Sequence, residues 1–153
     1  GVQPMPGEKI IDLFAGMGTF TYPLARAGAH VRAVDVDVYQ GAVAWPVAAG
    51  RDVLPGVVTS EARNLYKAPV RAEDLRAYGA IIFDPPRAGA KGQAVEIMRS
   101  DVDVIVAVSC NPASFITDCT PFLRAGYVFE KLTIVDQFLW SAHVELVGIF
   151  RKH

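Results

Sequence analysis

The 153-residue chain contains only two cysteines, and they form no metal-binding or disulfide pattern. Cys110 and Cys119 lie outside any CxxC or mixed Cys/His motif, which argues against a zinc site, an iron–sulfur cluster within this chain and a disulfide scaffold. No apolar run approaches the roughly 18 residues of a membrane-spanning helix, and no signal-peptide pattern begins the chain. We therefore expect no metal, no membrane partner and a cytoplasmic location.

The chain also lacks an excess of charge of either sign. Its 15 Lys and Arg residues are balanced by 16 Asp and Glu residues, giving a net charge of −1. Because a domain that binds RNA or DNA unaided usually carries a basic excess, a nucleic-acid partner would require a local basic patch or another domain. The length and the 52% hydrophobic content predict one domain over residues 1–153. Since the chain opens at Gly1 rather than methionine, we expect a module of a longer protein.

Apolar runs alternate with helical patterns along the chain, as is typical of an α/β protein. The expected strands are 9–14, 30–35, 57–60, 80–84 and 103–108, and the expected helices are 19–27, 38–49, 93–100 and 113–125, with a partly helical stretch at 65–76. This alternation predicts a doubly wound, mostly parallel sheet. The last two β-rich segments, 127–135 and 143–150, have no helix between them, so they predict a hairpin with one antiparallel strand.

Cys110 directly follows the apolar run 103–108, which predicts a buried central strand. In open α/β sheets the carboxyl ends of such strands hold ligands and chemistry. Asn111 suits a helix N-cap and Pro112 suits the first helical turn, so the positive end of a helix dipole would face the sulfur and favour thiolate. The alternative is an ordinary small buried residue, the usual role of a free cysteine.

A glycine turn, Gly16-Met-Gly18, follows the first expected strand and begins after the carboxylate of Asp12. Glycines there let the backbone turn tightly and approach a ligand. A dinucleotide fingerprint would need a third glycine where Thr21 stands, and Asp12 would be a poor neighbour for a pyrophosphate. Asp35 ends the second strand, where an acid can accept hydrogen bonds from ribose hydroxyls. These features favour S-adenosylmethionine, which has a sulfonium, an amino-acid tail and a ribose but no phosphate.

Two further acidic residues border expected strands. Asp84 ends the fourth strand and is followed by two prolines and Arg87, a sequence that alone predicts a rigid loop with an exposed salt bridge. Glu145 lies at the start of the last strand, where a glutamate is normally a solvated charge. The predicted hairpin, however, would return Glu145 to the edge of the sheet near Cys110.

Four stretches, in this order and spacing, resemble the C-terminal catalytic domain of RNA 5-methyluridine methyltransferases. They are DLFAGMGTF at 12–20, DPPRAGA at 84–90, SCNPASF at 109–115 and HVE at 143–145. The resemblance spans residues 9–151 and is strongest to the ribosomal RNA branch. It implies a Rossmann-like, class I S-adenosylmethionine-dependent methyltransferase fold. It also implies an RNA substrate, rRNA rather than tRNA, held mainly by upstream domains absent from this chain.

The same resemblance implies residue roles. The SCNP cysteine, Cys110, would attack the uracil ring, and the HVE glutamate, Glu145, would be the base. The DPPR aspartate, Asp84, would lie between substrate and cofactor. The expected catalytic residues are thus Cys110, Glu145 and Asp84, and the expected cofactor-binding residues are Asp12, Phe14, Gly16, Gly18, Thr19, Asp35, Asn64 and Asp84.

Elementary chemistry agrees with these roles. The C5 carbon of uracil is not nucleophilic enough to take a methyl group unaided, and thiolate addition at C6 makes it enolate-like. The C5 proton must then leave, which requires a base. Cys119 shares an apolar helical face with Phe115, Phe122 and Leu123, so we expect it in the core.

Three other functions stay open. The first is a cofactor-binding domain that is inactive without its RNA-binding partner. A nicotinamide-dependent oxidoreductase is disfavoured by the missing third glycine and by Asp12. A cytosine-5 methyltransferase also uses cysteine addition, but the HVE base favours uracil.

Overall fold

The computed structural model describes residues 4–36, 57–136 and 144–152. The strands are β1 (Lys9–Leu13), β2 (His30–Asp35), β3 (Val57–Ala62), β4 (Ala80–Phe83), β5 (Val104–Ser109), β6 (Tyr127–Asp136) and β7 (Val144–Lys152). The helices are α1 (Thr21–Arg26), α3 (Ala72–Leu75), α4 (Lys91–Ser100) and α5 (Pro112–Arg124). The helix expected over 38–49 lies outside the described residues. None of the described helices is long and apolar enough to cross a membrane.

The seven described strands form one sheet in the order β3-β2-β1-β4-β5-β7-β6. Strands β1 to β5 are parallel to one another, whereas β7 runs antiparallel to both β5 and β6. The predicted doubly wound sheet with a terminal hairpin and a single antiparallel strand is therefore confirmed.

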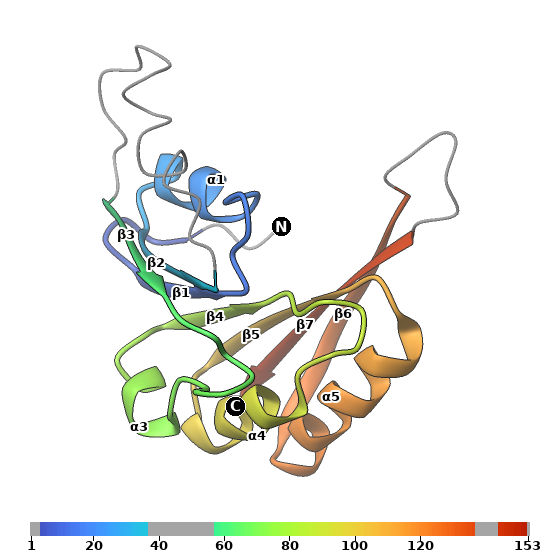
Figure 1. Ribbon diagram of the computed structural model, residues 1–153. Coiled ribbons are helices and arrows are strands. Elements are labelled where there is room, and N and C mark those ends of the chain that lie inside the picture. The colour runs from blue at the N-terminus through green and yellow to red at the C-terminus, as the bar shows by residue number, and fades with distance from the viewer. Residues whose placement is uncertain (1–3, 37–56, 137–143, 153) are drawn as a thin grey trace.

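Helices cover the sheet on two sides, with α1 on one face and α3, α4 and α5 on the other (Figure 1). Because side chains alternate along a strand, adjacent residues of β1 join different cores. Ile10 packs with Ala25 and Val31 on the α1 side, and Ile11 packs with Ile97 on the other. The central strands read as continuous apolar runs because both of their faces are buried.

The direction of winding changes between β1 and β4. The chain proceeds from β1 outward to β2 and β3, then returns to β4 on the other side of β1 and continues to β5. In sheets of this kind the ligand crevice lies beyond the carboxyl ends of the strands at such a switch point. The two strand ends are joined there, since the Asp84 amide donates to the Leu13 carbonyl at 3.2 Å.

Helix α5 buries a narrower face than the sequence suggested. Cys119 and Phe122 are 4% and 0% exposed, which agrees with the predicted apolar face, but Leu123 is 51% exposed, so its placement on that face was wrong. At about 100° of rotation per residue, Leu123 lies at the margin of the stripe that Phe115 and Phe122 define. Asp118, only 4% exposed, lies on the buried side instead.

Candidate functional site

The glycine turn after β1 folds against the end of β2. The Gly16 amide donates to Asp35 Oδ2 at 2.7 Å, and the Val36 amide donates to Asp35 Oδ1 at 2.7 Å. Gly16 and Gly18 have φ of +54° and +83°, in the left-handed region. A Cβ on Gly18 would lie 2.6 Å from the Tyr22 ring. Both glycines are thus required by the backbone, and Asp35 stands beside the turn as predicted.

Phe14 adopts a backbone conformation that is unfavourable for a bulky residue. Its φ is +63°, a left-handed value that costs an L-residue about 1–2 kcal/mol. Its ring packs against Tyr66 and Phe83, with centroids 5.5 and 6.1 Å away. Packing against these rings therefore holds Phe14 in a strained backbone conformation just before the glycine turn. Such strain often occurs at functional sites.

Asp12 is fully buried at the end of β1. Its Oδ2 accepts a hydrogen bond from Thr21 Oγ1 at 2.7 Å, while its Oδ1 has no partner among the described residues. Burial, opposed by the hydrogen bond from Thr21 and assisted by the charge of Asp35, raises the pKa of Asp12 to about 7. A buried acceptor without a donor calls for a ligand or water. Its carboxylate suits the ammonium of an amino-acid tail.

Asn64 and Thr19, both expected to contact the cofactor, lie in loops at the same edge of the sheet. Asn64 Oδ1 accepts from the amides of Tyr66 at 3.0 Å and Lys67 at 3.2 Å, which fixes the turn after β3 and leaves Nδ2 as a donor. Thr19 is exposed in the turn before α1. With Phe14 and Asp35 they follow the ends of three neighbouring strands, so the fold gathers the predicted cofactor residues at one edge.

Asp84 lies at the end of β4, beside this group. Burial, together with the nearby charges of Glu145, Asp12 and Asp35, raises the pKa of Asp84 to about 7. These acids stand in or next to β1, β2, β4 and β7, so carboxyl groups from four strands influence one another at this edge. The carboxyl of Asp84 is thereby able to hold a proton near neutral pH.

Cys110 and Glu145 are brought together by the pairing of β5 with β7. The last pair of that ladder is Ser109 with Leu146, so the next residue on each strand is Cys110 and Glu145. Cys110 is exposed. Asn111 caps α5 by accepting from the Ala113 amide at 3.1 Å, which confirms the predicted cap. His143 of the HVE motif lies outside the described residues.

Cys119 differs from Cys110 in its exposure to solvent. It is buried within α5, and burial raises the pKa of its thiol to about 12. The reactive form of cysteine is the thiolate, so Cys119 has no such form at neutral pH. Its predicted role as a core residue is confirmed.

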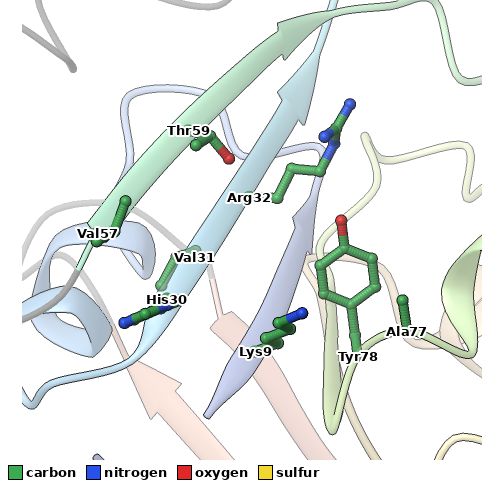
Figure 2. A pocket seen from close by; sticks show the side chains of 8 residues that line it. All are labelled: Lys9, His30, Val31, Arg32, Val57, Thr59, Ala77 and Tyr78. Atoms are coloured by element: carbon green, nitrogen blue, oxygen red, sulfur yellow. The ribbon is translucent and has the colours of Figure 1, made fainter. Parts of the chain in front are cut away.

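A hollow lies at the opposite edge of the sheet from the predicted site (Figure 2). Its lining includes Lys9, His30 and Val57, the first residues of three parallel strands. Arg32, also in its wall, pairs with Glu61 at 2.8 Å, which offsets its charge. This hollow is therefore separate from the predicted site. Among the described residues, no group of three or more His, Cys, Asp or Glu side chains could hold a metal ion.

Known proteins similar to this chain are methyltransferases. A family model described as tRNA (uracil-5-)-methyltransferase matches residues 60–153. An uncharacterized RNA methyltransferase of Rhizobium meliloti is 45% identical over 145 residues, covering 95% of this chain and 34% of that protein. The 23S rRNA (uracil(1939)-C(5))-methyltransferase RlmD of Hahella chejuensis is 37% identical over 158 residues, covering 99% of this chain and 34% of that protein.

A solved structure of a uracil-5 methyltransferase also matches this chain. The tRNA (uracil-54, C5)-methyltransferase of Pyrococcus abyssi, in complex with S-adenosyl-L-homocysteine, matches with a TM-score of 0.74 at 29% identity. The match covers 94% of this chain and 34% of that one, so the chain spans about a third of the length of the relatives it matches. The predicted Rossmann-like methyltransferase fold is confirmed. The chain belongs to the S-adenosylmethionine-dependent tRNA (uracil-5-)-methyltransferase family.

Proposed function

We propose that this chain is the catalytic part of an enzyme that transfers a methyl group from S-adenosylmethionine to C5 of a uridine in structured RNA. The β5–β7 register carries the proposal, because it sets Cys110 and Glu145 side by side at the edge where the carboxyl group of Asp84 also lies. This combines a nucleophile and a base at one place, as the chemistry of uracil requires.

Cys110 begins the reaction. Its thiolate forms a bond to C6 of uracil, and the electrons of the C5–C6 double bond move toward C5 and O4. The N-terminus of the 13-residue helix α5 provides a positive dipole end beside the sulfur. A protonated Asp84, whose pKa is about 7, can donate a hydrogen bond to the oxygen on which negative charge collects.

Glu145 ends the reaction. S-adenosylmethionine, when bound, supplies the methyl group that C5 takes up. Glu145 then removes the proton from C5, the electron pair of that C–H bond restores the C5–C6 double bond, and the thiolate of Cys110 leaves C6. This order makes Cys110 necessary before methyl transfer and Glu145 necessary after it.

The cofactor residues fit this donor. The unpartnered Oδ1 of Asp12 suits the ammonium of its amino-acid tail, and Asp35 suits its ribose hydroxyls. Gly16, Gly18, Phe14, Thr19 and Asn64 complete the proposed site. Two of the residues that would hold the cofactor, Asp12 and Asp35, are acidic and would be poor neighbours for a pyrophosphate, which again disfavours the nicotinamide-dependent oxidoreductase.

The RNA itself would be bound mainly by parts of the protein outside this chain. The net charge is −1, whereas attraction to phosphates supplies most non-specific RNA affinity. We favour ribosomal RNA over tRNA because the relative named for 23S rRNA is 37% identical and the one named for tRNA is 29% identical. A cytoplasmic location follows from such a substrate.

The test compares three variants of the complete protein. Cys110→Ala should abolish methylation and form no covalent RNA adduct. Glu145→Gln should also stop turnover, but methylated RNA should accumulate on Cys110 because the C5 proton stays in place. Cys119→Ala, the matched control, should retain activity. A denaturing gel with radiolabelled methyl donor separates these results.

Two outcomes would refute the assignment. If Cys119 proved essential and Cys110 dispensable, Cys110 would not be the nucleophile. If the complete protein bound S-adenosylhomocysteine but methylated no uridine-containing RNA, the chain would be a cofactor-binding domain only.

A further inference from the structure

Helix α5 holds the loop that follows Asp84. Three polar side chains from one face of the helix, spaced by three and four residues, contact the backbone of residues 84–90. Asn111 Nδ2 and Ser114 Oγ donate to the Arg87 carbonyl at 3.1 and 2.8 Å. Asp118 Oδ2 accepts from the Ala90 amide at 2.8 Å. The loop is thus tied along two turns of the helix that begins beside Cys110.

The loop approaches α5 so closely that only glycine fits at one position. Gly89 has φ of +77°, and a Cβ there would lie 2.6 Å from Asp118 Oδ2 and 3.0 Å from Ser114 Cβ. The backbone at Gly89 therefore packs directly against Ser114 and Asp118. On the other side of the loop, Tyr66 donates through its hydroxyl to the Gly89 carbonyl at 3.0 Å.

Tyr66 also connects the loop to the cofactor side of the site, because its ring packs 5.5 Å from Phe14. The segment from Asp84 to Ala90 therefore contacts both the helix that begins next to the nucleophile and, through Tyr66, the residues around the turn that would hold the methyl donor. A displacement of this segment would change the position of Asp84 relative to both.

Asp118 is the most unusual of the three side chains that contact the loop. It is 4% exposed and stands on the buried stripe of α5, where an apolar side chain would normally pack. Burying a carboxyl is unfavourable unless it is hydrogen-bonded. Its partner is the backbone amide of Ala90, the N-cap of α4, a residue with no side-chain acceptor to cap that helix. A carboxylate at a helix N-terminus is stabilised by the helix dipole.

We propose that Asp118 is a positioning residue for methyl transfer, which fixes the loop behind Asp84 to the helix that begins next to Cys110. The proposal rests on the function proposed above. Asp118 acts through the Ala90 amide and touches neither reactant. Its removal should leave the cofactor site intact and misplace Asp84 against the nucleophile.

The test uses the complete protein with Asp118→Ala, Asp118→Asn and, as the matched control, Cys119→Ala. Cys119 is the next residue, is equally buried in the core, and takes no part in the hydrogen bonds that tie the loop to α5. Asp118→Ala should lower kcat and the rate of adduct formation at least tenfold, with S-adenosylhomocysteine affinity changed less than threefold. Asp118→Asn should restore most of the rate, because its side-chain oxygen still accepts from Ala90.

Urea unfolding of each variant measures how much stability the substitution removes. If Asp118→Ala lowered kcat no more than Cys119→Ala at equal loss of stability, or if Asp118→Asn were as slow as Asp118→Ala, the positioning role would be refuted.

Amide hydrogen exchange separates this proposal from the function itself. In the 153-residue chain, Asp118→Ala should speed exchange of the Ala90 amide and the loop before it, whereas Cys119→Ala should not. If the loop amides exchanged at the same rate in Asp118→Ala as in the wild type, the proposal would be refuted, whatever the methyltransferase activity. A protein that methylates no RNA, but whose loop exchanges faster in Asp118→Ala, would refute the proposed function and leave the anchoring by Asp118 in place.

Discussion

The affinity for S-adenosylhomocysteine should rise with pH because of Asp12. Its pKa of about 7 means that the carboxyl is mostly protonated at pH 6 and mostly ionised at pH 8. The ammonium of the ligand would favour the ionised form, so the free carboxyl must lose its proton for tight binding. With roughly one tenth ionised at pH 6 and nine tenths at pH 8, affinity should increase about tenfold, or about 1.4 kcal/mol.

Titration calorimetry at pH 6, 7 and 8 measures this increase, and two controls assign it. 5′-Methylthioadenosine lacks the amino-acid tail and should bind with little dependence on pH. Asp12→Asn should flatten the profile for S-adenosylhomocysteine, because the asparagine does not titrate and can still accept from Thr21. Asp84→Asn should preserve the rise, although Asp84 has a similar pKa.

The reasoning would be refuted by either of two results. A flat profile for S-adenosylhomocysteine in the wild-type chain would mean that Asp12 does not face the ammonium. A tenfold rise that persisted in Asp12→Asn would assign the titration to another group.

Two further predictions concern the same chain. Asp35→Ala should weaken S-adenosylhomocysteine binding by roughly 1–3 kcal/mol, since the ribose and the Gly16 and Val36 amides all lose an acceptor, and an unchanged affinity in calorimetry would contradict the assignment of Asp35. The isolated chain should bind structured RNA poorly at physiological salt, because its net charge is −1; tight binding in a filter assay would show that recognition lies within these residues.

Most of the fold could be predicted because its signals are local. The apolar runs of β1, β4 and β5 mark strands buried on both faces, and Gly28, with φ of +102°, ends the first helical segment where the sequence placed a stop. Asn111 and Pro112 identify the start of α5 for the same reason, since a cap involves only neighbouring residues.

The contacts that organise the site could not be predicted in this way. Asp118 binds an amide 28 residues earlier, and Tyr66 binds a carbonyl 23 residues later. Neither pairing leaves a pattern in the sequence, because each depends on how α5 and the β3–α3 connection pack against one loop. Leu123 was misplaced for a related reason, because helical periodicity alone does not show which side of the apolar stripe of α5 faces solvent.

Thr21 links the two features that argued against a dinucleotide site. The sequence shows a carboxylate, Asp12, before the glycine turn and a threonine where a third glycine would stand. The structure shows that these belong together, because Thr21 is buried and its hydroxyl donates to Asp12 at 2.7 Å. A glycine at this position would leave the buried carboxyl with no donor among the described residues. The turn is thus built to keep a carboxyl group, with one oxygen held by Thr21 and the other buried without a partner among the described residues.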